Sequence, residues 1–498
     1  MAQSDQKQHI DSSNTVFHTQ QQVYHQQIII ENAVRDVDLS YCEFHQKNKP
    51  QSNSVAGGIL LLFVSGMHIG WGIWRILLTE PWTFNVSDVG MVQFLFMSWF
   101  VFAVVGSVVG AVLVTRVTKK SIYYIGGALL VPSSIIFIAL SKEYRAIIAA
   151  RCLAGFAHGI VYSATITHAT ENVVKETRGM LLSSINCVMF SGVFVSSTLV
   201  ATVSSDYTAD MTGVFGIIAL AVTVLAVVCT IFLTYESVPF LLRRGNESEA
   251  IINLLKLRNE SFMTPKLTHD LEEMKLMVGQ DVRENANILA DGNASVTGKM
   301  ITLRVLAVMT NNFMINYTLI SMVALLFDLD NYHMAPAVLS GSRFIGSLVP
   351  VFSTDFFKRK SHLAVSSVTS GSLLLVLAII VETVSFASSS SYWILGVLSI
   401  AFQLFVSIGI DPLQHLLLSE AFSTSKKAWS MALVTSVEYC LQILFVGLLF
   451  LPPMTALRLN VLRFITVGIM LVLALFLQLA LPETFKKSIK ETRDLFRK

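Results

Sequence analysis

Residues 55–78 read VAGGILLLFVSGMHIGWGIWRILL, an almost unbroken apolar run. The run is as long as the roughly 20 residues that carry a helix across a bilayer. Lipid offers the backbone no hydrogen-bond partners, so a run of this kind must be helical. Comparable runs occupy residues 89–114, 121–141 and 213–235. The chain is therefore predicted to cross a membrane several times as α-helices.

The composition agrees with this prediction. Of the 498 residues, 53% are hydrophobic and 14% are charged, whereas soluble domains are about 25% charged. We predict an all-α polytopic membrane protein with twelve transmembrane helices, surrounded by membrane lipid. The predicted spans are residues 55–78, 89–114, 121–141, 146–170, 180–204, 213–235, 301–327, 334–354, 361–384, 392–418, 428–450 and 459–480.

The distribution of positive charge predicts the orientation. Most of the 36 Lys and Arg residues fall in segments that are cytoplasmic if both termini are inside, as the positive-inside rule requires. Residues 1–54 are polar and have no signal-peptide pattern. They are rich in Gln, His, Asn and Ser, so we expect a disordered cytoplasmic tail. We expect the protein to lie in the plasma membrane.

The sequence contains no pattern typical of an enzyme. The five cysteines are scattered and suggest neither a disulfide framework nor a metal site. We find no Gly-rich phosphate loop, no metal-ligand cluster and no nucleophile–base pair. The prediction is therefore a protein without catalytic residues, cofactors or nucleic-acid partners.

The spans divide six and six around a charged segment. We predict a first six-helix bundle at 55–235, a cytoplasmic linker at 236–300, a second bundle at 301–480 and a cytoplasmic tail at 481–498. Apolar stripes in the linker favour two or three short amphipathic helices lying against the membrane. A plain flexible linker is the alternative.

Charged residues repeat between the two halves. Glu171 precedes Arg178 by the same interval as Glu420 precedes Lys427. Other charges recur about 240 to 250 residues later. The charged segment with Arg116 after the second span corresponds to the one with Asp355 and Arg359 after the eighth, and Glu236 after the sixth span corresponds to Glu483 after the twelfth. Such a repeat predicts two bundles related by an axis along the membrane normal, with a solute site between them at mid-membrane.

These residues resemble the major facilitator superfamily, and within it the sugar porters, the glucose and trehalose transporter family. Arg151, Gly155 and Gly159 with Glu171 and Arg178 follow the family's spacing, and the chain carries a version of its PESPRFLL segment at residues 236–242. Residues 481–484 match the PET ending. Residues 115–120 lack the acid of the family's D-R-x-G-R-R loop, so the chain resembles a divergent member.

The resemblance implies a set of solute-binding residues. Amides supply both donors and acceptors to sugar hydroxyls. The positions that match the family's binding residues are Asn186, Thr310, Asn311, Asn316 and His415. An interhelical hydrogen bond is the alternative for each of them.

Charges at the cytoplasmic ends of the spans are predicted to gate the pore, because opposite charges there can bridge the bundles in one state and separate in the other. This set is Arg116, Glu171, Arg178, Glu236, Asp355, Arg359, Glu420 and Lys427. Ordinary positive-inside charges are the alternative, which we favour for Lys119.

Arg343 and Glu438 lie inside spans, where the resembled family has amides. A lone charge at mid-bilayer is costly, so it faces a cavity or a partner. The two could pair with each other, the reading we favour, or contact a charged solute. His68 stands where some proton-coupled relatives carry an acid, and we read it as a satisfied interhelical histidine.

We therefore predict a facilitative carrier that moves a small polar solute, a sugar, by alternating access. An organic-ion transporter of the same fold and a solute sensor that does not transport are the alternatives.

The topology makes a prediction for glycosylation. Asn85 belongs to a sequon in the first outer loop, whereas the sequons at Asn246 and Asn293 are cytoplasmic. We expect glycosidase treatment to shift the wild type on a gel and to leave Asn85→Gln unchanged. A glycan at Asn246 or Asn293 would contradict this topology.

Overall fold

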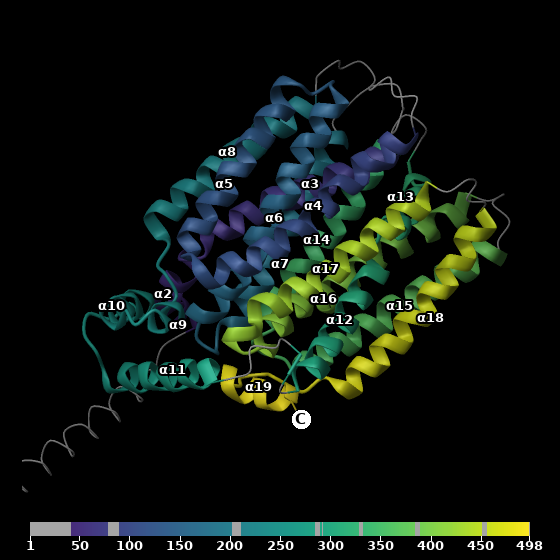
Figure 1. Ribbon diagram of the computed structural model, residues 1–498. Helices are drawn as coiled ribbons and strands as arrows, with labels where there is room; N and C mark the ends of the chain where they lie inside the picture. The colour runs from purple at the N-terminus through teal and green to yellow at the C-terminus, as the bar shows by residue number, and fades with distance from the viewer. Residues whose placement is uncertain are drawn as a thin grey trace, which may run out of the picture. The chain divides into compact units, whose positions relative to one another are not determined.

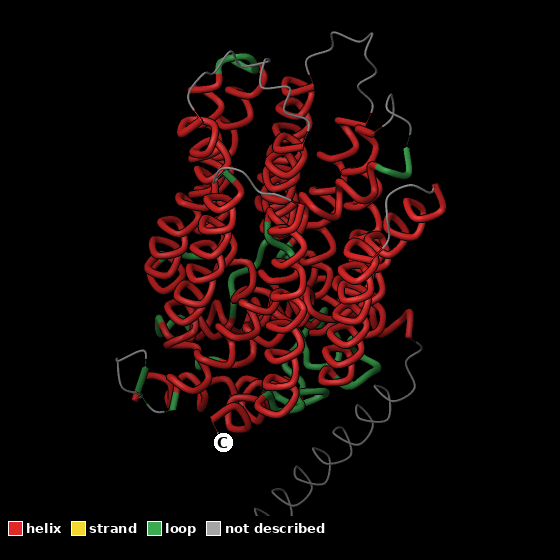
Figure 2. Tube along the Cα trace, turned by 90° about the vertical axis from the view of Figure 1, so that its right-hand side faces the viewer, coloured by secondary structure: helices red, strands yellow, loops and turns green. Residues whose placement is uncertain are grey.

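In a computed structural model, the structure describes residues 41–77, 89–201, 211–283, 289–290, 292–327, 332–383, 389–450 and 456–497. Within these residues every regular element is a helix, and Figure 2 draws no strand. Asn85 lies outside them. The chain falls into two compact units, the larger formed by Ser52–Glu236 and Asp281–Lys498, the smaller by Ser237–Gln280 with the segment ending at Gln51.

The larger unit contains the membrane helices. In its described part, eleven helices are long and apolar enough to cross a membrane. They are α3 (Ala56–Leu77), α4 (Val89–Arg116), α5 (Lys119–Ala139), α6 (Tyr144–Asn172), α7 (Arg178–Ala201), α8 (Met211–Leu233), α14 (Ala335–Ser353), α15 (Arg359–Thr383), α16 (Ser389–Ala421), α17 (Thr424–Leu449) and α18 (Ala456–Ala480). The helices α3–α8 and α12–α18 form two groups, purple to teal and green to yellow in Figure 1.

The remaining pass is made in two pieces, α12 (Asn293–Thr310) and α13 (Phe313–Ala324). The sequence predicts a span at 301–327, and the structure divides this span into two helices at Asn311. Asn311 leaves the helical conformation at a φ of −139°, and the Asn312 side chain caps α13 by accepting from the Ile315 N–H. Short polar side chains compete with the helical backbone in this way. The break leaves the Asn311 backbone carbonyl outside the helical ladder, where it accepts from Gln442 Nε2 at 3.0 Å.

Small residues bring α4 and α6 together. A Cβ added to Gly155 would lie 2.1 Å from the Trp99 carbonyl oxygen, and one added to Gly159 would lie 2.4 Å from that of Ala103. Glycine permits this close approach of two membrane helices. It places Trp99 of α4 against His158 of α6, with 4.7 Å between ring centroids.

The two bundles meet chiefly through α4 and α7 of the first bundle. Helix α4 packs against α17, and α7 packs against α14 and, less extensively, α16. A short helix, η2 (Tyr332–Met334), precedes α14, and α19 (Ile489–Arg497) follows the last span. The phenyl rings of Phe194 on α7 and Phe344 on α14 stack across this boundary at 5.8 Å.

The smaller unit is helical, as the apolar stripes of the linker indicate. It contains α9 (Val238–Arg243), α10 (Glu247–Arg258), most of α11 (Pro265–Arg283) and most of α2 (Tyr41–Asn53). Lys47 of α2 pairs with Glu260 at 2.9 Å. The expected disorder of residues 1–54 therefore does not extend over α2.

Candidate solute-binding site and gate

A cavity lies between the two bundles. Its walls come from α3, α4, α6 and α7 on one side and from α12, α13, α16 and α17 on the other. Its volume is about 60 Å³, which is room for about four water molecules. A ring-sized solute needs the bundles or side chains to move apart.

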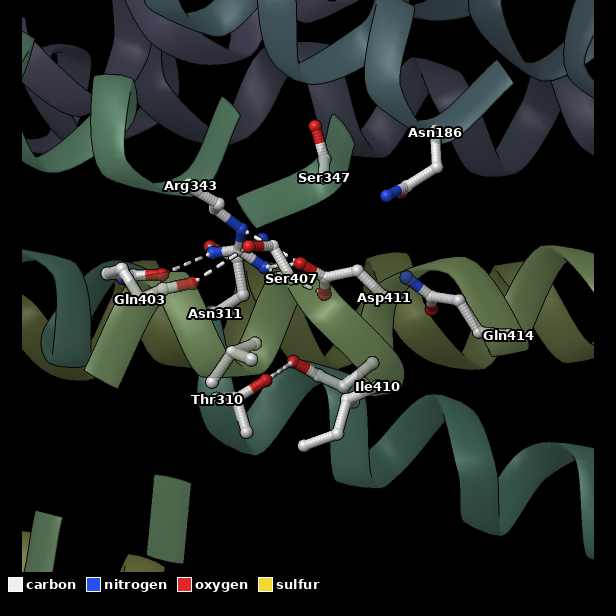
Figure 3. Close-up of polar contacts among 12 residues, drawn as sticks. Asn186, Thr310, Asn311, Arg343, Ser347, Gln403, Ser407, Ile410, Asp411 and Gln414 are labelled. Atoms are coloured by element: carbon white, nitrogen blue, oxygen red, sulfur yellow. Dashed lines mark hydrogen bonds and ion pairs between the residues drawn. The ribbon is translucent and has the colours of Figure 1, made fainter. Parts of the chain in front are cut away.

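An ion pair of Arg343 with Asp411 lies behind this cavity. The Arg343 guanidinium, on α14, donates to both carboxylate oxygens of Asp411, on α16, at 2.8 Å. It also donates to Asn311 and to Gln403, and Figure 3 shows it lying among these three side chains. Both charges are at least 95% buried. A bidentate, fully hydrogen-bonded pair is the arrangement that compensates a buried guanidinium.

Arg343 orients the amides at the break between α12 and α13. Its donation fixes the Asn311 side-chain oxygen, which also accepts from Asn316 Nδ2 at 3.1 Å. Gln403 Nε2 in turn donates to Asn316 Oδ1 at 3.2 Å. Asn311 and Asn316 line the cavity, whereas Thr310 donates to the Ala307 carbonyl and does not line it.

A second ion pair faces the cavity itself. Arg304 on α12 donates to Glu438 on α17 at 2.8 Å and to Gln414 on α16 at 2.8 Å. Those two bonds come from Nη1, and Nη2 of Arg304 donates to the hydroxyl of Tyr162, which belongs to the first bundle. Arg304 and Glu438 are the charged side chains among the described residues that line the cavity, and they compensate each other.

These contacts correct one prediction from the sequence. Arg343 and Glu438 do not pair with each other, because Arg343 pairs with Asp411 and Glu438 pairs with Arg304. The sequence reasoning missed Asp411 and gave Arg304 no role. The signal was present, since an acid or a base inside an apolar run normally has a nearby partner.

A hydrogen-bonded chain through His415 joins the bundles. His415 on α16 contacts the Tyr162 hydroxyl at Nδ1 (2.6 Å) and the Asn186 side-chain oxygen at Nε2 (3.1 Å). Because Arg304 donates to the Tyr162 oxygen, the hydroxyl proton is free to bond Nδ1, and Nε2–H then donates to Asn186. This order of donors describes a neutral imidazole held by two residues of the first bundle.

The bundles also meet where α6 and α16 finish, which we call the gate end. Arg178 at the start of α7 pairs with Glu420 of α16 at 3.2 Å, and Arg359 of α15 pairs with the same carboxylate. Asp355 accepts from the backbone N–H of Gly179 (2.9 Å) and from that of Met180 (2.8 Å). Burial raises the pKa of Asp355, and these two donors and Arg359 oppose that rise.

The predicted charge repeat appears as matching contacts in each bundle. Lys119 pairs with Glu171 and with Glu236, each at 3.5 Å. Glu236 accepts from the Lys119 N–H at 2.7 Å, and Glu483 accepts from the Arg359 N–H at 3.2 Å. Each acid thus caps the third helix of its own bundle.

Three placements bear on the predicted gate. Lys119, for which the sequence favours an ordinary positive-inside charge, is buried and lies between Glu171 and Glu236. Arg116 is exposed at the end of α4, and Lys427 is buried near the start of α17. The structure brings Arg178, Asp355, Arg359 and Glu420 together, and Glu171 and Glu236 around Lys119.

The helix arrangement and the compensated mid-membrane cavity define a secondary transporter of the major facilitator type. A family model described as "Sugar (and other) transporter" matches residues 40–496. The chain belongs to this family, which confirms the sequence-based prediction of a sugar-transporter-type membrane carrier.

Solved structures support the same fold. The proton:xylose symporter XylE bound to 6-bromo-6-deoxy-D-glucose superposes with a TM-score of 0.74 at 15% identity, covering 90% of this chain and 98% of that one. The inward-open xylose transporter XylE from E. coli gives a TM-score of 0.63 at 14% identity, covering 89% and 98%. A search of curated proteins finds no match.

The Arg343–Asp411 pair predicts a specific stability pattern. Asp411→Asn or Arg343→Gln alone leaves the partner charge buried and uncompensated, which should cost about 3–5 kcal/mol. Combining them removes both charges, so the loss should be well below the sum of the two single losses. Thermal unfolding of the purified variants in detergent measures this, and strictly additive losses would exclude the pair.

The gate contacts predict that Glu420→Gln opens the gate end. The variant loses the charge that Arg178 and Arg359 share. The control is Glu176→Gln, which removes an exposed carboxylate that pairs with Lys175 and acts on Arg178 only as the weakest of its electrostatic contacts. In a background free of native cysteines, Ser183→Cys reports access to the interface. We expect Glu420→Gln to raise its rate of alkylation about fivefold or more, the scale of a coupling of 1 kcal/mol or more.

Alkylation at the same rate in Glu420→Gln, in Glu176→Gln and in the unmodified background would contradict a gating role for Glu420.

Proposed function

We propose that this carrier moves an uncharged, polyhydroxylated solute, a sugar, by alternating access and without a coupled ion. The observation that carries the proposal is the charge balance of the site. Arg304 and Glu438, which line the cavity, are bound to each other, and Arg343 behind it is bound to Asp411. Such a site presents no excess charge to a solute.

This balance argues against the organic-ion alternative. An ionic solute would have to separate Arg304 from Glu438, and an anion or cation would then leave one of the two buried and unpaired. A sugar places hydroxyls, which both donate and accept, against the amides of Asn311, Asn316 and Gln442 that line the cavity.

The first bundle argues for transport without proton coupling. Its buried Arg151 donates to the carbonyl oxygens of His68 at 2.9 Å and of Leu95 at 3.0 Å. His68 packs edge-on against the rings of Phe137 and Phe215, at 5.3 Å and 5.2 Å. Neither of its ring nitrogens has a hydrogen-bond partner among the described residues, so the expectation of a satisfied interhelical histidine is wrong. No carboxylate contacts Arg151 or His68 among the described residues, so this region lacks an acid that could alternate between binding a proton and pairing with Arg151.

The gate end supports alternating access. In this structure Arg178, Glu420 and Asp355 hold the two bundles together there. Opening toward that side requires these contacts to break. The cavity is then exposed at the gate end while the opposite side closes. We assign the gate end and both termini to the cytoplasm and propose the plasma membrane as the location of the carrier. We also propose gating roles for Arg116, Glu171, Glu236 and Lys427.

Uptake into proteoliposomes tests the proposal. Labelled D-glucose, D-xylose and trehalose are offered with and without a pH gradient, with protein-free liposomes as the control. Unlabelled neutral sugars, choline and lactate are then offered as competitors. We expect uptake of at least one sugar, unchanged by the pH gradient. Neutral sugars should inhibit this uptake at concentrations at least about tenfold lower than choline or lactate requires.

Stronger competition by choline or lactate would favour the organic-ion carrier. Binding of a sugar without uptake would favour the sensor, and uptake driven by the pH gradient would favour His68 as a proton carrier.

A further inference from the structure

Four polar atoms on the cavity wall have no hydrogen-bond partner among the described residues. They are Trp99 Nε1, His158 Nδ1, Arg304 Nε and Gln442 Oε1. An unsatisfied buried polar group costs about 1–3 kcal/mol, and native proteins keep few of them. These four differ from the other such atoms of the described residues in lying together on the wall of one cavity, where a bound solute could supply the missing partners.

Trp99 and His158 are held so that neither can turn to a partner in the protein. The close approach of Gly155 to the Trp99 carbonyl fixes the backbone at that point. The Trp99 ring contacts Phe100 edge-on at 5.0 Å and His158 at 4.7 Å. His158 Nε2 bonds the Tyr439 hydroxyl at 2.9 Å, which directs its other nitrogen away from that contact.

The four atoms specify the chemistry of the missing partner. Trp99 Nε1–H and Arg304 Nε–H can only donate, so they need acceptors. Gln442 donates through Nε2 to the Asn311 carbonyl at 3.0 Å, which leaves its Oε1 in need of a donor. If His158 Nε2–H donates to the Tyr439 hydroxyl, Nδ1 is an acceptor. If the hydroxyl donates to Nε2, Nδ1 carries the proton and is a donor.

A hydroxyl satisfies either kind of atom, because it donates and accepts. A carboxylate offers only acceptors and an ammonium group only donors, so neither satisfies all four positions. The set therefore matches a solute with several neighbouring hydroxyls.

We propose that Trp99 and His158 bind solute hydroxyls from the first bundle, opposite Arg304 and Gln442 of the second. This inference rests on the proposed sugar transport and adds to it. It makes Trp99 and His158 specificity-determining residues, in addition to the amide positions implied by the sequence resemblance. A solute held from both bundles also links occupancy of the cavity to the approach of the bundles.

The variants are chosen to remove one polar atom each. Trp99→Phe keeps an aromatic ring and removes the N–H. His158→Gln keeps a polar group near the position of Nε2, where Tyr439 bonds, and removes the atom at Nδ1. Trp71→Phe is the control, since Trp71 is equally buried but packs on Arg151 and does not line the cavity.

The measurement is the KM for the sugar that wild-type protein takes up among D-glucose, D-xylose and trehalose. Loss of one hydrogen bond to a hydroxyl should raise KM about three- to tenfold in Trp99→Phe and in His158→Gln, and Trp71→Phe should stay within twofold of wild type. The mono-deoxy analogues of D-glucose are then used as competitors. One deoxy analogue lacks the hydroxyl that bonds Trp99, and it should compete weakly with wild-type protein. Its affinity should fall no further in Trp99→Phe, because the missing hydroxyl and the missing indole N–H belong to the same hydrogen bond.

The outcomes separate the two proposals. If wild-type protein takes up none of the sugars, the proposed function fails. If it takes one up, and Trp99→Phe and His158→Gln keep both the wild-type KM and the wild-type pattern of analogue competition, the sugar carrier stands and this inference is wrong. If Trp99→Phe does not fold, His158→Gln decides alone by the same two readings.

Discussion

A charge buried inside a membrane protein must be compensated by a countercharge or by hydrogen-bonding dipoles, and this constraint organises the interior of the carrier. The cost of leaving a guanidinium or carboxylate uncompensated in a low-dielectric setting exceeds the contribution of most single contacts. Arg343 meets Asp411 and Arg304 meets Glu438, each through hydrogen bonds as well as charge. The proposed solute site lies beside these pairs, so they contribute to both its shape and its lack of excess charge.

The two pairs act at different depths of the site. Arg343 lies behind the break between α12 and α13 and holds the Asn311 amide in place. Arg304 lies at the cavity and reaches the Tyr162 hydroxyl of the first bundle. The first pair therefore supports the shape of one wall, and the second connects the two walls. Movement of the bundles alters the second connection and can leave the first intact.

Much of the fold could be predicted from the sequence, because hydropathy and the charge repeat depend only on residue type and spacing. The correspondence of Glu236 with Glu483 was visible as a spacing, and the structure gives both residues the same capping role. The break at Asn311 was missed because the span on either side is apolar enough to be read as one helix.

The partners of the buried charges could not be predicted in the same way. Which charges meet depends on the rotation and tilt of each helix, and residue spacing along one helix does not determine them. Asp411 was passed over within an apolar run, so Arg343 was assigned the wrong acid. Trp99 and His158 were not candidates, because their relation to the cavity depends on the close packing of α4 and α6.

The central claim is that an uncharged solute crosses through a charge-compensated site with no accompanying ion. The most direct test is the electrical current across a supported membrane carrying the reconstituted protein when the transported sugar is added. The account predicts uptake without a sustained current, at acidic and at neutral pH alike. A sustained current that depends on the sugar would contradict it, because charge would then move with the solute.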